Sequence, residues 1–87
     1  MHIRMLVEEC VCDANDLESG SLDEGLIQEL TRKVEPHAQR AVRNCERGGY
    51  SHRWARAVAA GKRALALDSR ANAAFSLFTG RVMAGME

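Results

Sequence analysis

Apolar residues recur at helical spacing along this sequence, and this spacing limits the possible fold more than any other feature. Near the N-terminus, six of them fall at i, i+3, i+4, i+7, i+8 and i+11: Ile3, Leu6, Val7, Cys10, Val11 and Ala14. Near the C-terminus, five follow a similar rule: Ala71, Ala74, Phe75, Phe78 and Val82. Because such a pattern places its members on one face of a helix, it predicts helices over about residues 2–16 and 70–84.

A β-strand is the alternative for the start of the chain, through the alternation of Ile3, Met5 and Val7. This strand would lose its register at Glu8 and Glu9, and the rest of the sequence offers no partner strand. The composition also favours helices. Aromatic residues make up only 5% of the chain, so leucine, methionine and many alanines must fill the core, and these residues suit close-packed helices.

Turn and capping residues divide the middle of the chain. The stretch ESGSLDEGL places Ser21 before a helical pattern and Glu24 three residues later, which is the arrangement of a capping box. A helix is therefore predicted to begin at Leu22. Pro36 lacks a backbone N–H and crowds the preceding turn, so we predict a break close to it. A further helical stretch then continues to the double glycine of RGGY.

Two more helices complete the expected fold. Ser51 is a good N-cap for a helix over about residues 52–67, and Asp68 or Ser69 for the last helix. Together these elements predict an all-α fold, a small bundle of four to five short helices arranged as helical hairpins, in a single domain over residues 1–87. A chain of 87 residues buries only about 60% of its unfolded surface, so a single core is expected. Its large members should be Trp54, Leu65, Phe75 and Phe78.

The segment WARAVAAGKRALALDSRANAAFSLFTG resembles the joint between two tetratricopeptide repeats, with small residues inside one helix and Phe75 opening the next. It departs from the family at Ser69, where a proline is expected, and at Gly80, which falls one residue late. No second copy of about 34 residues precedes it. The resemblance therefore implies hairpin packing of alanine-rich helices, and it identifies no repeat protein.

Charge is distributed unevenly, although the formal net charge is zero. Residues 1–30 carry eight acids and one base, whereas residues 31–87 carry eleven bases and four acids. Such asymmetry either marks a partner-binding face or is satisfied internally when the two parts pack together. The order of residues does not decide between these alternatives. Ten arginines against two lysines are compatible with a GC-rich bacterial or phage genome.

Arginine is concentrated around the double glycine, and Tyr50 and Trp54 stand in the same stretch. On helices of about 100° per residue, Arg53, Arg56 and Arg63 lie on nearly the opposite side from Trp54. A second basic row lies on the preceding helix, beside or opposite its apolar residues. The candidate partner-binding residues are Arg40, Arg43, Arg47, Tyr50, Arg53, Arg56 and Arg63.

Three interpretations of these arginines are open. They bind an acidic surface of a protein partner, for which arginine and tyrosine are typical anchors. Alternatively, the arginine-rich helical hairpin is a helix-turn-helix that reads nucleic acid with residues 52–67, although this stretch has no Asn or Gln for contacts to adenine. The third possibility is an ordinary solvated face. Self-association as a homodimer also remains open.

The sequence predicts neither a metal site, nor a cofactor, nor a catalytic set. Cys10 and Cys12 would point about 200° apart on a helix, which is wrong for a shared zinc ion, and Cys45 with His52 lacks an orienting third group. We expect buried structural cysteines in a reducing compartment, no membrane span and a cytoplasmic location. The predicted function is therefore non-catalytic: stoichiometric binding to another protein or complex as an adaptor, regulator or inhibitor, of a kind that phages or plasmids carry.

Overall fold

The computed structural model describes residues 2–15, 23–45 and 52–85, and these residues form four helices. They are α1 (Ile3–Ala14), α2 (Glu24–Cys45), α3 (His52–Ala64) and α4 (Ser69–Gly85). The predicted all-α bundle of four to five short helices is confirmed. No described residue belongs to a strand, so the alternative of a strand near the N-terminus is wrong.

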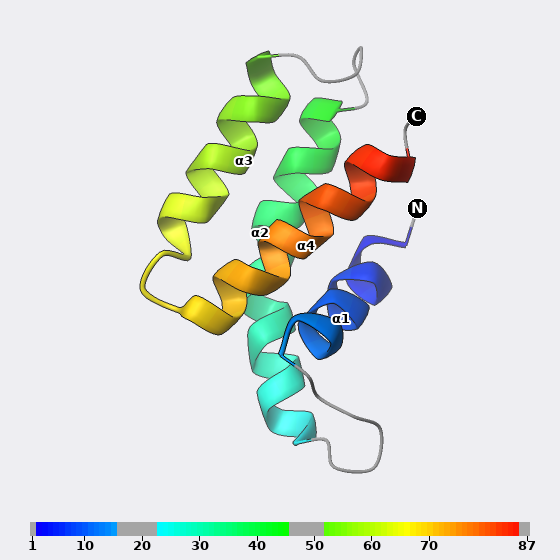
Figure 1. Cartoon of the computed structure of the whole chain (residues 1–87), viewed down its shortest axis with the longest axis vertical. Coiled ribbons are helices and arrows are strands. Elements are labelled where there is room, and N and C mark those ends of the chain that lie inside the picture. The colour runs from blue at the N-terminus through cyan, green and yellow to red at the C-terminus, as the bar shows by residue number, and fades with distance from the viewer. Residues whose placement is uncertain (1, 16–22, 46–51, 86–87) are drawn as a thin grey trace.

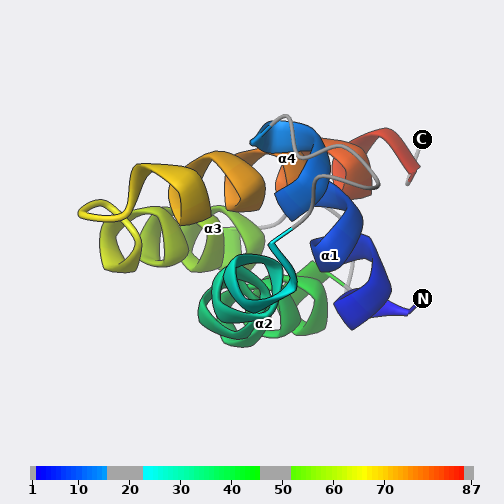
Figure 2. The same cartoon turned by 90° about the horizontal axis from the view of Figure 1, so that it is seen from below.

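The other three helices all contact α2, which is the longest of the four described helices. Figure 1 shows α2 and α3 side by side and running in opposite directions, with α4 passing in front of α2. α1 packs against α2 and α4 on the other side from α3, and α1 and α3 do not contact each other. The view from below in Figure 2 shows α4 above the layer that α2 and α3 form. α2 and α4 each contact all three other helices, so these two together position α1 and α3.

One hydrophobic core joins all four helices. Phe75 and Phe78 of α4 are completely buried, and Trp54 and Leu65 are 4% and 6% exposed. The prediction that these four side chains share one core is confirmed. α1 and α2 contribute smaller residues to the same cluster: Val7, Cys10, Val11, Ile27, Leu30, Val34, Ala38, Ala41, Val42 and Cys45.

The predicted helix break at Pro36 is wrong, because α2 continues through this residue from Glu24 to Cys45. Pro36 is exposed, whereas Val34 and Ala38 on the inner face are completely buried. The carbonyl that loses its donor, that of Arg32, belongs to an exposed residue where water can replace the lost hydrogen bond. Burial of the inner face on both sides of Pro36 thus keeps the two halves in one helix.

Aspartates cap the two helices whose starts were predicted from turn chemistry. Asp23 Oδ1 accepts a hydrogen bond from the N–H of Leu26 at 3.2 Å, so α2 begins at Glu24 instead of Leu22. Asp23 therefore has the capping role that we assigned to Ser21, and Ser21, Leu22 and Ser51 lie outside the described residues. Asp68 Oδ1 accepts from the N–H of Ala71 at 3.2 Å, which confirms the cap predicted for α4.

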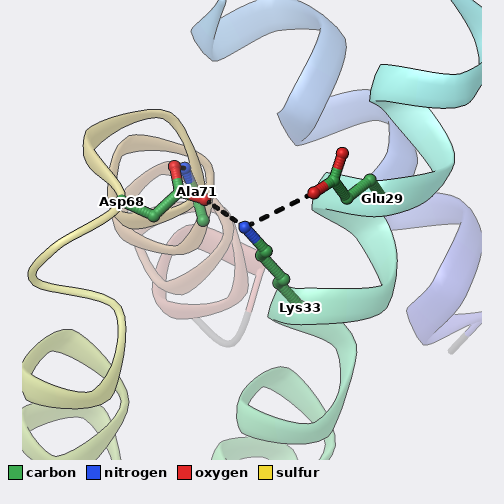
Figure 3. A network of polar contacts seen from close by, with 4 residues as sticks. All are labelled: Glu29, Lys33, Asp68 and Ala71. Atoms are coloured by element: carbon green, nitrogen blue, oxygen red, sulfur yellow. Dashed lines mark hydrogen bonds and ion pairs between the residues drawn. The ribbon is translucent and has the colours of Figure 1, made fainter.

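Asp68 also joins α4 to α2. Its second carboxylate oxygen, Oδ2, accepts a hydrogen bond from Lys33 Nζ at 2.8 Å, and Lys33 Nζ lies 3.7 Å from Glu29 Oε1 (Figure 3). One side chain therefore caps a helix and forms a contact between helices. The Lys33 ammonium, followed by the N–H of Ala71, holds the pKa of Asp68 below its ordinary value.

A close approach of three helices occurs at Gly61 of α3. A Cβ atom at this position would lie 2.6 Å from the ring of Phe75 and 3.3 Å from Cβ of His37. Only glycine leaves enough room, because Phe75 is completely buried and its ring has little freedom to move. Beyond Gly61, α3 ends at Ala64, three residues before its predicted end, and the chain turns toward the cap at Asp68.

We predict that Gly61→Ala destabilises the fold although alanine is the better helix former. The overlap with Phe75 should outweigh a propensity gain of about 1 kcal/mol and lower the free energy of unfolding by about 1–2 kcal/mol. Gly80→Ala is the matched control, since nothing lies within 4 Å of its added Cβ, and it should raise stability by about 0.5–1 kcal/mol. Urea unfolding measures both. Stabilisation by both substitutions would contradict the close contact.

We also predict that the two roles of Asp68 can be separated. Asp68→Ala removes the cap and the ion pair and should lower the free energy of unfolding by about 1–2 kcal/mol. Asp68→Asn preserves an N-capping side chain and loses only the charge attraction, so its loss should stay below about 1 kcal/mol. Thermal unfolding at low and high salt tests this, and equal losses in the two variants would show that the cap contributes nothing.

Candidate protein-binding surface

α3 carries a row of arginines on its outer side. Arg53, Arg56 and Arg63 are exposed, whereas Trp54 and Gly61 on the opposite side are buried. The predicted orientation of this helix is therefore confirmed. Within the described ranges, no ion pair joins any of the three to an acid. We call Arg53, Arg56 and Arg63 the α3 row.

The remaining candidate residues lie on or after the second half of α2. Arg40 and Arg43 are exposed on this helix, as the predicted basic row requires. Neither has an ion-pair partner in the part of the chain that the structure describes. Arg47 and Tyr50 lie outside the described residues.

Of the two arginines on α2, Arg40 lies nearer than Arg43 to the contact between α2 and α3. His37 lies beside Gly61, and the two helices run in opposite directions (Figure 1). One turn beyond His37, Arg40 therefore lies level with the part of α3 that contains Arg56. Around α2, Arg40 is only about 60° from His37, whereas Arg43 is about 120° away.

Arg40 and Arg43 both line a shallow hollow on the outer side of α2. Residues of this one helix line it: Arg32, Glu35, Pro36, Gln39, Arg40 and Arg43. Arg32 is exposed and was not among the candidate residues predicted from the sequence. Arg32, Arg40 and Arg43 stand at i, i+8 and i+11, and this helical spacing could have placed Arg32 on the same face as the other two.

Other basic residues form ion pairs with acids of the same chain, so part of the uneven charge is balanced within the molecule. Arg81 Nη2 of α4 lies 2.5 Å from Asp13 Oδ2 of α1, and Arg81 Nη1 donates to Cys10 Sγ at 3.7 Å. Lys33 pairs with Glu29 and Asp68 as described above. The α3 row has no such contact to a described acid, which distinguishes it from these bases.

Two of the three cysteines, Cys10 and Cys12, lie where the protonated thiol is favoured. None of the three forms a disulfide, and Cys10 and Cys45 are buried as predicted. Burial raises the pKa of the Cys10 thiol above its ordinary value, and the positive charge of Arg81 only partly opposes this. Burial, followed by the Asp13 carboxylate, also raises the pKa of Cys12. A raised pKa reduces the thiolate fraction that nucleophilic chemistry or metal binding would use.

The described residues contain no group of three His, Cys, Asp or Glu side chains placed to hold a metal ion. None of the described helices combines the length and the apolar character that a membrane crossing needs. No family model matches the sequence, and comparisons with curated proteins and with solved structures give no match.

His37 generates a prediction about pH. Burial first, and the nearby charge of Arg40 second, hold the pKa of His37 below its ordinary value of about 6.5. The unfolded chain therefore takes up this proton at a higher pH than the folded chain does. Stability present above pH ~6.5 should be lost as the pH falls through the lowered pKa. Urea unfolding between pH 7.5 and pH 5 measures this decline.

Any replacement of His37 also alters its edge contact with Phe75, whose ring centroid lies 6.3 Å away, and so changes stability at every pH. The variants are therefore compared by how steeply their free energy of unfolding falls with pH. His37→Gln should flatten the decline, whereas His52→Gln, at an exposed position on α3, should leave it unchanged. Asp68, whose pKa is also lowered, acts only in more acidic solution, below about pH 4. An unaltered decline in His37→Gln would assign the effect to another group.

Proposed function

We propose that this protein acts without catalysis, by stoichiometric binding to another protein, as an adaptor, regulator or inhibitor. The binding surface consists of the α3 row together with Arg40 of α2, and its partner presents an acidic surface. The observation that carries this proposal is the line of three exposed arginines on α3 without an ion pair to any described acid.

The chemistry of arginine supports a partner-binding role. A guanidinium group is weakly hydrated and forms paired hydrogen bonds with a carboxylate, so arginine is favoured at protein interfaces. Arg56 and Arg63 are seven residues apart, about 10.5 Å along α3, and therefore face the same direction. A partner can contact both without any rearrangement of the helix.

Nucleic acid is the competing class of partner, and two features of the structure favour a protein instead. Trp54 is buried, so it offers no exposed ring on which a base could stack beside the arginines. α2 and α3 lie side by side (Figure 1), whereas the helices of a helix-turn-helix cross steeply so that the second one enters the major groove.

The proposal is tested by capture from a lysate of the source cells with and without nuclease, followed by affinity measurement with the purified partner. Replacing Arg53, Arg56 and Arg63 together by Gln should weaken binding by at least about 30-fold, because one interface hot spot accounts for 2 kcal/mol or more. The fold should remain intact, since exposed charges contribute little to stability. Circular dichroism checks this.

Lys62→Gln/Arg70→Gln is the control for Arg56→Gln/Arg63→Gln, because both pairs remove two exposed charges and only the second lies in the α3 row. The control should bind like the wild type. If the partner is nucleic acid, capture will depend on nuclease treatment, and the triple variant should flatten the salt dependence by about 2.7 log units per log unit of salt. Equal losses in control and test variants would contradict the proposed surface.

A further inference from the structure

A second surface of α2 has a charge pattern that is complementary to itself. Six polar residues follow one another at helical spacings of 4, 4, 3, 4 and 4: Glu24, Gln28, Arg32, Glu35, Gln39 and Arg43. At about 100° per residue, they occupy an arc of about 100° on α2. We call these six residues the α2 stripe.

The order of charges along the α2 stripe reads acid, amide, base, acid, amide, base. When two copies of α2 lie antiparallel, Glu24 of one copy faces Arg43 of the other, and Arg32 faces Glu35. The two amides, Gln28 and Gln39, then face each other as well. A twofold axis near the middle of the helix repeats each pair, so every charge of the stripe meets its opposite.

The α2 stripe is accessible to a second molecule. Five of its residues are exposed, and the Glu35 side chain is 24% exposed. Arg32, Glu35, Gln39 and Arg43 line the shallow hollow on the outer side of α2. Figure 2 shows α2 at the lower edge of the molecule, where the other three helices lie above or beside it. A second helix can approach α2 from this edge, and α1 borders the stripe on the side of Glu35 and Gln39.

The charges of the stripe are only partly used within the chain. Glu24, Arg32 and Arg43 form no ion pair with any residue in the described ranges. Glu35 Oε2 accepts a hydrogen bond from Gln39 at 3.0 Å, and Glu35 Oε1 lies 3.9 Å from Arg4 Nη1 of α1. A carboxylate has about four acceptor positions, so Glu35 retains capacity for Arg32 of a second copy.

We propose that two copies of this chain associate as a symmetric dimer through antiparallel α2 stripes. The twofold arrangement uses the same surface on both copies and therefore closes at two chains. Because its contacts are mostly exposed ion pairs, the dimer is weak and sensitive to salt, with a dissociation constant on the order of 0.1 mM. It leaves the α3 row free, although Arg40 borders the same hollow as the stripe, and it does not depend on the function proposed above.

Equilibrium sedimentation of the wild-type chain at low salt should show an average mass that approaches twice the 9.6 kDa chain mass at about 1 mM protein, and dissociation in about 0.5 M salt. Arg43→Glu should weaken association by about tenfold or more, because it places Glu against Glu at two symmetric positions. Glu24→Arg should act in the same way through Arg against Arg.

The decisive variant is Glu24→Arg/Arg43→Glu, which exchanges the charges and preserves the net charge of zero. It should restore association to about the wild-type level. Such recovery would show that the single variants were weak because of the charge contacts, and not because of a defect in the fold or an altered net charge. Arg70→Glu is the matched control, with the same change of charge as Arg43→Glu at an exposed position outside both the stripe and the α3 row. It should leave the dissociation constant within about threefold of the wild type.

Three results would overturn the proposal. The first is a wild-type chain that stays monomeric at low salt, and in that case crosslinking through Arg43 would show whether another protein occupies the stripe. The second is a double variant that remains as weak as the single variants. The third is growth beyond two chains with rising concentration, since head-to-tail contacts would then replace the closed twofold arrangement.

Discussion

The contact of Gly61 with Phe75 and His37 determines how three of the four helices fit together. Here α3 approaches α4 and α2 so closely that no side chain fits between them. Because Phe75 is completely buried, the contact allows little sliding of α3 along α2. The position and rotation of α3 follow from it, and so does the direction in which Arg56 and Arg63 point. A constraint inside the core thus places the charges of the outer surface.

The helices and their buried faces could be predicted because each depends on residues close in sequence. The apolar pattern of residues 71–82, for example, contains its own period and needs no knowledge of the neighbouring helices. Pro36 shows where such reasoning fails. Its local preference for a helix break is overridden by packing of Val34 and Ala38 against other helices, which the sequence does not display. The choice between Ser21 and Asp23 as cap likewise depended on where the tertiary fold begins α2.

For the candidate surface, the sequence could predict which residues of a single helix are exposed, but not how residues of different helices lie relative to one another. The exposure of the α3 row followed from its position opposite Trp54. Which of Arg40 and Arg43 lies nearer to α3 depended on the contact of His37 with Gly61, and this contact joins residues far apart in the sequence. The ion pairs between acids and bases of different helices could not be predicted either. Nothing in the sequence separated Arg81, which contacts Asp13 across the fold, from arginines that remain available.

α2 thus has two edges with different surroundings, and the two proposed associations would use different parts of the molecule, the α3 row and the α2 stripe. The edge with His37 faces Gly61 of α3 and Phe75 of α4, whereas the edge with Glu35 faces Arg4 of α1 and bears the α2 stripe. A dimer formed through the stripe would display two copies of the α3 row on one particle. A partner with two acidic sites in reach would then bind through both, and the second contact would form at high effective concentration. Even a weak dimer would therefore tighten binding to a repetitive or symmetric partner more than to a monomeric one.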